Sequence, residues 1–434
     1  MNKATSTNCN FSIVDLKVLK QKVLNWANRF STFCFLDNHH YQIEPHTQEC
    51  LLAVGRNKFI ESKAGEALEK LDRFISPGGD FRPRWLFGHL GFDLKNEIEH
   101  LHSNHDDHIQ FPDLFFSQPE ILIRWNEKEM TIESSQRGAE EIFESIMQAD
   151  EKIRITKPVT LQNKITRTEY ISVIRELQKH LLRGDCYEIN FCQEFFAEDV
   201  MIDPVNVYQK LAAVSPNPFS ALYKLEDKWL ICASPERFLK KTGNRILSQP
   251  IKGTARRNEN AGIDRQSEGE LRSSAKERSE NVMVVDLVRN DLSRICVEGS
   301  VKVDELFGIY SFPQVHQMIS TVSGQLRPDL SFANIIRATF PMGSMTGAPK
   351  KKVLELIEQY EKTKRGIFSG AVGYIDPSGD FDFNVVIRSI TYNEANKYLS
   401  FQTGSGITFY SEPEKEWEEC LLKAEAMKKV LEEI

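Results

Sequence analysis

Lys252 stands in a short segment, Pro-Ile-Lys-Gly-Thr at 250–254, whose residue types suit chemistry on a small anion. Gly253 has no side chain, so the backbone can approach a ligand closely, and Thr254 adds one hydroxyl. A lysine that is shielded from water can lose its proton and act as a nucleophile. The alternative is an ordinary exposed lysine after a proline turn, because most lysines lie at protein surfaces.

Glu236 lies in a second segment of this kind, Ser-Pro-Glu-Arg-Phe at 234–238, directly after an apolar run at 229–233. The pattern predicts a carboxylate at the end of a strand. A rigid strand positions the loop that follows it, so this is a good place for a catalytic acid. A turn held by an arginine and a glutamate is the structural alternative.

Two pairs of glutamates recur three residues apart, Glu277 with Glu280 and Glu416 with Glu419. In a helix this spacing puts both carboxylates on one face, where like charges repel mildly. Two such faces that met would favour a divalent cation between them. Oxygen ligands alone favour Mg²⁺, which keeps water molecules and also binds substrate oxygens. Glutamates at this spacing are also common on exposed helices.

Other segments could hold an anionic ligand. A Gly-, Ser- and Thr-rich loop at 340–350 leads into a predicted helix, whose first N–H groups suit a carboxylate or phosphate. It lacks the spacing of a Walker A loop. The run Gln-Thr-Gly-Ser-Gly-Ile at 402–407 is predicted as a second loop of backbone donors. Arg388 and Lys423 could each bind a carboxylate, Arg388 through its planar guanidinium.

The elements that position these residues follow from apolar spacing. A capping box, Thr-x-x-Glu at 166–169, and apolar residues at helical spacing predict a helix up to residue 181. Strands are predicted at 186–192, 220–223, 229–233, 370–375, 383–392 and 398–403, and helices at 274–297, 332–340, 349–359 and 413–433. No βαβ period repeats, so the predicted class is α+β with a large mixed or antiparallel sheet. A break near 157–160 separates an N-terminal region, 1–155, from a catalytic region, 160–434.

The composition excludes several classes of protein. A chain of 434 residues with 41% hydrophobic and 27% charged residues is typical of a soluble globular protein. A formal net charge of −7, without a basic stripe and interleaved aromatic residues, argues against a nucleic-acid binder. No run approaches the roughly 20 apolar residues of a membrane span. The eight cysteines are scattered without zinc-site spacing, so we expect buried, reduced thiols in a cytoplasmic protein.

Taken together, these segments resemble the chorismate-utilising enzymes, which include the anthranilate, aminodeoxychorismate, isochorismate and salicylate synthases. The resemblance runs from about residue 85 to the C-terminus and is dense over 166–423. It implies large sheets packed as a sandwich with helices on the outside. The family segments occur in family order: Ser-Pro-Glu-Arg-Phe, Pro-Ile-x-Gly-Thr, Asp-Leu-x-Arg-Asn-Asp-Leu, Gly-Ser-x-Thr-Gly-Ala-Pro-Lys, Gly-x-Gly-Ile and Glu-x-x-Glu.

The residue after Pro-Ile distinguishes branches of this family. Anthranilate synthases have alanine there and aminodeoxychorismate synthases have lysine, so Lys252 resembles the second branch. Isochorismate and salicylate synthases place a water-activating lysine near position 188, and Glu188 argues against that route. The aminating branches more commonly have glutamine there, so Glu188 is a departure to which the resemblance assigns no role. Anthranilate synthase component I and a non-catalytic chorismate-binding subunit are the alternatives.

The resemblance also implies residue roles. Lys252 would attack C2 of chorismate and form a covalent adduct while Glu236, as general acid, protonates the departing C4 hydroxyl. Ammonia would then attack C4 and expel the lysine, giving 4-amino-4-deoxychorismate for para-aminobenzoate and folate synthesis. The implied substrate-binding residues are Gly253, Thr254, His316, Thr346, Tyr374, Arg388, Gly404, Gly406 and Lys423.

Two partners besides chorismate are implied. Mg²⁺ would lie between Glu280 and Glu419, supported by Glu277 and Glu416, and would bind the ring carboxylate. No Gly-x-Cys-x-Gly loop for glutamine hydrolysis occurs, so the resemblance implies that ammonia comes from a separate glutamine amidotransferase subunit. The Leu-Leu-Glu-Ser run of feedback-regulated anthranilate synthases is also absent, so we expect no strong inhibition by tryptophan.

Overall fold

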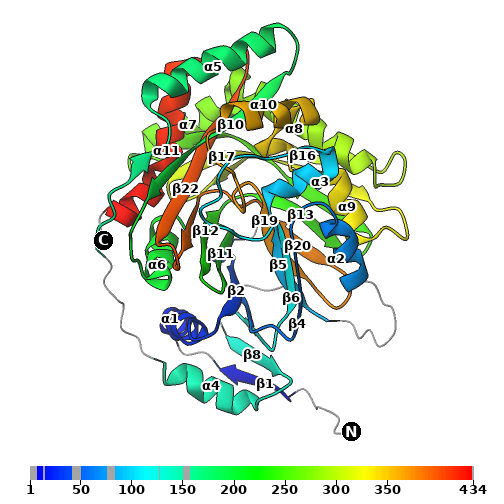
Figure 1. The fold of residues 1–434 in the computed structure, drawn as a ribbon, viewed down its shortest axis with the longest axis vertical. Helices are drawn as coiled ribbons and strands as arrows, with labels where there is room; N and C mark the ends of the chain where they lie inside the picture. The colour runs from blue at the N-terminus through cyan, green and yellow to red at the C-terminus, as the bar shows by residue number, and fades with distance from the viewer. Residues whose placement is uncertain are drawn as a thin grey trace.

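Two β-sheets pack face to face at the centre of the molecule, and helices cover both outer faces (Figure 1). The structure is a computed structural model that describes residues 7–12, 15–41, 50–75, 84–126, 128–149 and 157–432. Within these ranges every strand pairing is antiparallel. The predicted α+β sandwich is therefore confirmed, with sheets that are antiparallel throughout the described chain.

The larger sheet joins strands from both ends of the chain. In the described residues it has twelve strands, and β9 (Gln162–Asn163) pairs with β10 outside the main order. Its order is β1 (Thr7–Ser12), β8 (Glu129–Ser134), β7 (Ile121–Trp125), β3 (Cys50–Val54), β2 (Thr32–Asp37), β11 (Phe219–Leu225), β12 (Lys228–Ser234), β21 (Ser389–Asn393), β22 (Tyr398–Ile407), β10 (Glu188–Ala197) and β18 (Gly347–Ala348).

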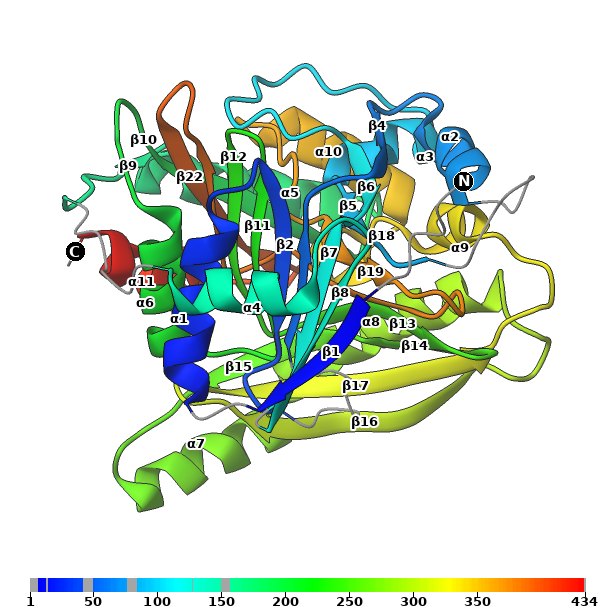
Figure 2. The same ribbon diagram turned by 90° about the horizontal axis from the view of Figure 1, so that it is seen from below.

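The smaller sheet is also built from both regions of the sequence, so the boundary near 157–160 does not separate the sheets. Figure 2 shows its long strands β16 (Lys302–Ser311) and β17 along the lower edge of the molecule. Its order is β15 (Ile251–Arg256), β17 (Val315–Gln325), β14 (Arg245–Gln249), β13 (Arg237–Thr242), β20 (Phe381–Asn384), β19 (Ala371–Ile375), β5 (Leu86–Leu90), β6 (Leu114–Gln118) and β4 (Lys58–Ser62), with β16 on β17.

Alternating side chains divide each sheet between two cores. In β2, Phe33 and Phe35 pack with the helices of the outer layer, whereas Cys34 packs in the core between the sheets with Phe87 and Val372 of the smaller sheet. The period of two along a strand produces this division. Helices packed on the larger sheet are α1 (Leu16–Ala27), α4 (Ala139–Met147), α5 (Arg167–Leu182), α6 (Pro204–Val214), α10 (Lys350–Tyr360) and α11 (Pro413–Glu432). Those packed on the smaller sheet are α2 (Ala67–Ile75), α8 (Ala275–Ser293) and α9 (Phe332–Thr339).

The predicted helices are confirmed, including the capping box in which Thr166 and Glu169 cap α5 reciprocally. The short helix α3 (Lys95–Glu99), the helix α7 (Ala261–Ser273) and two 3₁₀ turns, η1 (Phe92–Leu94) and η2 (Gly343–Met345), complete the described elements. The Asp-Leu-x-Arg-Asn-Asp-Leu segment lies in α8, where its Asp291 accepts a hydrogen bond of 2.9 Å from Lys350 at the start of α10.

The strand predicted over 383–392 is wrong. The chain leaves the smaller sheet after β20 and enters the larger sheet at β21, so the run serves two sheets. Arg388 lies at this crossover with a φ of +52°, a left-handed conformation outside the extended region of backbone space. The strand-like residues at 383–392 follow one another without a break, so the sequence gives no local sign that the chain passes from one sheet to the other there.

The loop predicted at 402–407 is also wrong, because this segment is the second half of β22. Gly404 pairs with Cys192 and Gly406 with Asn190 of β10. A Cβ atom at Gly404 would lie 2.0 Å from the carbonyl oxygen of Phe191. Glycine thus permits close approach of two strands here rather than a turn.

The seven cysteines whose side chains are described, all except Cys9, are buried and form no disulfide with one another. Burial raises the pKa of the Cys296 thiol to about 11, so this thiol is not ionised at neutral pH. No helix in the described ranges has the length and apolar character needed to cross a bilayer.

Arg237, next to Glu236 in the sequence, ties β13 to the neighbouring strand β20. Its guanidinium is fully buried and donates two hydrogen bonds to Asp382, both 3.0 Å long. We expect Arg237→Leu to lower the free energy of unfolding by about 3 kcal/mol, because the Asp382 carboxylate is left buried without this partner. Urea unfolding measures the loss. The control is Arg175→Leu, which breaks an exposed pair with Glu414 and should cost less than about 1 kcal/mol. Equal losses would contradict the prediction.

Candidate active site

A cavity of about 980 Å³ lies between β15, β22, α8 and α11. Its size suits a small organic ligand, and its walls are strongly polar. The predicted residues that line it come from both sheets and from two helices. They are Glu236, Lys252, Gly253, Thr254, Glu277, Glu280, Arg388, Gly404, Gly406, Glu419 and Lys423.

Lys252 points its amine at Glu188. The Lys252 Nζ lies 2.5 Å from Glu188 Oε1, and both residues are buried, with 9% and 2% of their surfaces exposed. Burial by itself would lower the pKa of Lys252, but Glu188, Glu280 and Glu419 together raise it well above its usual value. The lysine is therefore a buried ammonium in the absence of substrate, not an exposed side chain.

Glu236 occupies the place that the sequence predicts, directly after β12, and only 3% of its surface is exposed. Burial raises the pKa of its carboxyl to about 7, although Ser344 and the charge of Lys252 partly oppose the rise. A carboxyl that is half protonated near neutral pH can donate a proton to a leaving group.

The two glutamate pairs face each other across α8 and α11, with a lysine between them. Lys276 Nζ lies 3.7 Å from Glu280 Oε1 and 3.5 Å from Glu416 Oε1. Within the described ranges, no group of three or more His, Cys, Asp and Glu side chains is placed to hold a metal ion. The positive charge that the structure places between α8 and α11 is the ammonium of Lys276, for which the sequence predicted no role.

The chemistry of these carboxylates nevertheless fits a hard cation. Burial raises the pKa of Glu280 to about 7, with Lys252 and Lys276 opposing the rise. One of its oxygens, Oε1, is buried without a hydrogen-bond partner among the described residues. Mg²⁺ commonly binds one or two protein carboxylates and takes its other ligands from water and substrate, so it does not require a larger protein cluster.

Arg388 and Lys423 supply cations to the cavity close to Glu419. Burial lowers the pKa of Arg388 to about 10, with Glu419 opposing the change. Its described hydrogen bond is to the carbonyl oxygen of Lys423, at 3.3 Å. Lys423 Nζ donates to the carbonyl oxygen of Gly404 at 2.9 Å and lies 2.7 Å from Glu419 Oε1. Burial alone would raise the pKa of Glu419, but Lys423 and Lys276 lower it to about 2.

Comparison with known proteins identifies the family. A profile of the chorismate binding enzymes matches residues 26–429, which is nearly the whole chain. The chain belongs to the chorismate-binding enzymes. It is 35% identical over 339 residues to aminodeoxychorismate synthase component 1 of Salmonella typhimurium, covering 77% of this chain and 74% of the relative. It is 34% identical over 358 residues to an anthranilate synthase component I-like protein of Synechocystis sp., covering 81% and 73%.

Solved structures agree with the fold of this chorismate-binding enzyme. Anthranilate synthase component I from Streptococcus pneumoniae superposes with a TM-score of 0.76 at 25% identity, covering 90% of this chain and 94% of that one. Relatives with different named activities thus share this architecture. Membership of the family alone does not determine which of these activities this protein has.

Four predicted residues lie outside the lining of the large cavity. The His316 imidazole lies between Ser311 and Asp264, with Nδ1 2.8 Å from Ser311 Oγ and Nε2 3.1 Å from Asp264 Oδ1. Thr346 is buried and donates its hydroxyl to the carbonyl oxygen of Met342. Glu416 is buried behind Lys276. The fourth residue is Tyr374.

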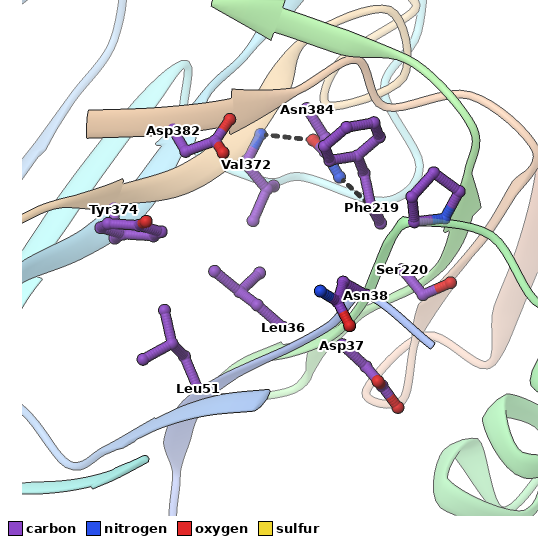
Figure 3. A pocket seen from close by; sticks show the side chains of 11 residues that line it. Leu36, Asp37, Asn38, Leu51, Phe219, Ser220, Val372, Tyr374, Asp382 and Asn384 are labelled. Atoms are coloured by element: carbon purple, nitrogen blue, oxygen red, sulfur yellow. Dashed lines mark hydrogen bonds between the residues drawn. The ribbon is translucent and has the colours of Figure 1, made fainter. Parts of the chain in front are cut away.

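Tyr374 faces a separate, smaller cavity of about 50 Å³ between the two sheets. Figure 3 shows this smaller cavity with Val372 on one side and with Leu36 and Leu51 on the other. Asn384 closes one end by accepting a hydrogen bond from the Val372 N–H and donating one to the carbonyl oxygen of Phe219. The expected role of Tyr374 in the large cavity is therefore inconsistent with its position.

Gln317, Ser344 and Lys276 are among the residues that line or border the cavity and that had no role predicted from the sequence. Gln317, next to His316 on β17, points into it, and its Oε1 is buried without a hydrogen-bond partner in the described part of the chain. Ser344, in η2, lies against Glu236. The Gly- and Ser-rich loop was the available signal for Ser344, whereas nothing in the local pattern distinguishes Gln317 or Lys276.

Gly406 makes room for the Lys252–Glu188 pair. A Cβ atom there would lie 2.6 Å from Lys252 Nζ and 2.7 Å from Glu188 Oε1. We expect Gly406→Ala to displace the amine and to reduce kcat/KM for chorismate about 100-fold, because misplacement of about 1 Å costs rates of that order. Steady-state kinetics measures the loss. The matched control, Gly269→Ala in α7, has open space at its Cβ and should leave the kinetics unchanged.

Proposed function

We propose that this chorismate-binding enzyme is an aminodeoxychorismate synthase component I, which converts chorismate and ammonia to 4-amino-4-deoxychorismate for para-aminobenzoate and folate synthesis. The observation that carries the proposal is the buried amine of Lys252 in the same cavity as Glu236. Relatives named aminodeoxychorismate synthase component 1 support it.

The chemistry needs both residues. Hydroxide is a poor leaving group, so Glu236 protonates the C4 hydroxyl of chorismate as it leaves. Lys252 attacks C2 as the ring double bonds shift, and this forms a covalent adduct. Ammonia then attacks C4 and expels the lysine, so two displacements place the new amine where the hydroxyl was.

The substrate's two carboxylates need cations as they enter a buried site. Arg388 and Lys423 are the candidate cations among the side chains that line the cavity. Mg²⁺ held by Glu280 and Glu419, with Glu277 and Glu416 nearby, would neutralise the ring carboxylate when bound. The proposal of Mg²⁺ follows the oxygen-only donor chemistry of these glutamates.

Ammonia would come from a separate glutamine amidotransferase subunit, and free ammonium at high concentration would substitute for it. The name "component 1" that these relatives carry is compatible with a two-subunit assembly. The biosynthetic role and the reduced thiols favour a cytoplasmic protein.

The second candidate is anthranilate synthase component I, because relatives of that name match with similar identity. The products separate the two. Purified protein is supplied with chorismate, Mg²⁺ and ammonium, and the mixture is resolved by chromatography with a coupled pyruvate assay. Aminodeoxychorismate without pyruvate supports the proposal, whereas anthranilate with pyruvate would replace it with the second candidate.

A further inference from the structure

The contact between Lys252 and Glu188 joins the two sheets. Lys252 lies on β15 of the smaller sheet and Glu188 at the start of β10 of the larger sheet, and their side chains meet at 2.5 Å. Gly406 of β22 leaves just enough space beside them. A contact that depends on three strands from two sheets is held rigidly, which is what proton transfer between two groups requires.

Glu188 is placed to exchange a proton with this amine. One carboxylate oxygen, Oε1, accepts a hydrogen bond from Lys252, and the other, Oε2, is buried without a hydrogen-bond partner among the described residues. The remaining charged groups around the amine are Glu236 after β12, Glu277 and Glu280 on α8, and Glu419 and Lys423 on α11. Among the ion pairs of the described chain, only Glu188 lies within 4.0 Å of Lys252 Nζ.

An ammonium has no lone pair, so Lys252 cannot attack a carbon in the state that its acidic neighbours favour. A proton must first leave Nζ. Bound substrate would expel water from the cavity, and a less polar site disfavours the charge-separated pair relative to neutral acid and amine. The carboxylate in direct contact is the nearest acceptor for that proton.

We propose that Glu188 accepts a proton from Lys252 before the lysine attacks and returns it when the lysine is expelled. The step converts an ammonium and a carboxylate into an amine and a carboxylic acid, with no net change in charge. The amine lone pair then forms the N–C2 bond, and the C4 hydroxyl leaves as water with the proton of Glu236. When ammonia attacks C4, the N–C2 bond breaks, the amine regains its proton from Glu188, and the ammonium formed at C4 returns a proton to Glu236. This inference rests on the proposed function.

The first test does not depend on the reaction. Lys252 is acetylated with acetic anhydride over pH 7–9, and its modification is followed by peptide mass spectrometry. Because only the neutral amine reacts, Glu188→Gln should react at least about tenfold faster at pH 8 than the wild type, the effect of a one-unit fall in the lysine pKa. Glu194→Gln is the matched control, since Glu194 is a buried carboxylate on the same strand, outside the cavity, and should match the wild type. Equal acetylation in Glu188→Gln and the wild type would overturn the proposal.

The second test uses the reaction with chorismate and ammonium, with free ammonia held at one saturating concentration at every pH. In the wild type the transfer is internal, so the rate should not rise with pH between 6 and 7, below the alkaline limb expected from Glu236. In Glu188→Gln the proton must go to solvent, so the rate should rise about tenfold per pH unit there. Glu188→Asp, which keeps a carboxylate, should restore the wild-type profile, and thermal unfolding checks that each variant folds. Identical profiles for wild type and Glu188→Gln would overturn the proton step while leaving aminodeoxychorismate formation intact. A wild type that forms no aminodeoxychorismate would overturn the proposed function, and the proton step with it.

Discussion

Lys252→Ala should lower the rate of aminodeoxychorismate formation by more than about 10³-fold, because removing a covalent nucleophile closes the two-step route. The amine is buried in the large cavity beside Glu236, and in the described chain no other lysine is paired with Glu188. Product chromatography under saturating chorismate and ammonium measures the loss. Intact-protein mass spectrometry without ammonium should detect an adduct on the wild type and none on the variant.

Lys252→Arg separates the nucleophile from its charge. Arginine keeps a cation opposite Glu188 but does not lose its proton in proteins, so this variant should be as inactive as Lys252→Ala while remaining folded. Lys302→Ala, on the exposed side of the same sheet, should retain full activity. Unchanged turnover in Lys252→Ala would exclude covalent catalysis by this residue.

Glu236→Gln should reduce kcat by about 10²–10⁴-fold, the usual contribution of a general acid. Glutamine preserves the volume and hydrogen bonding of the buried side chain but cannot protonate the C4 hydroxyl. The pKa of Glu236 is raised to about 7, so the acid is present below that pH and is lost above it. We therefore expect the wild-type rate to fall tenfold per unit above about pH 7, and this limb should be absent from the variant.

The pH–rate profile of Glu236→Gln tests the assignment of Glu236 as the general acid. A Glu236→Gln variant that keeps the same alkaline limb would assign that limb to another group. A variant with wild-type kcat would show that the C4 hydroxyl leaves without help from this carboxyl. A hydroxyl-free substrate analogue should bind both proteins equally, which confirms that only the chemical step has changed.

The parts of the site that lie at the ends of strong local patterns could be predicted from the sequence. Glu236 follows an apolar strand, and the glutamates of α8 and α11 keep helical spacing, so their positions depend on local structure alone. His316 and Gln317 are different. The resemblance implied His316 as a pocket residue, but adjacent strand residues face opposite sides, and in β17 it is Gln317 that lines the cavity.

The crossover at Arg388 escaped prediction for a different physical reason. Its flanking residues have strand character on both sides, and only the separation of the two sheets requires the chain to turn there. That turn directs Arg388 toward the cavity. Long-range packing thus decided both the break in the strand and the position of a cation, and no local pattern encodes either.

The pairing of strands from the first part of the chain with strands from the last part limits when each strand can pair during synthesis. β2 pairs with β11, β5 pairs with β19, and β12 can complete the larger sheet only through β21, near the end of the chain. A chain emerging from the ribosome can pair β2 with β3 and β5 with β6 early, but the second edge of β2 must wait for β11 and that of β5 for β19. Folding of this topology is expected to be slow, since distant segments must meet before contacts repay the loss of chain entropy. The nascent chain would expose open strand edges for much of its synthesis, which makes that interval the period of greatest aggregation risk.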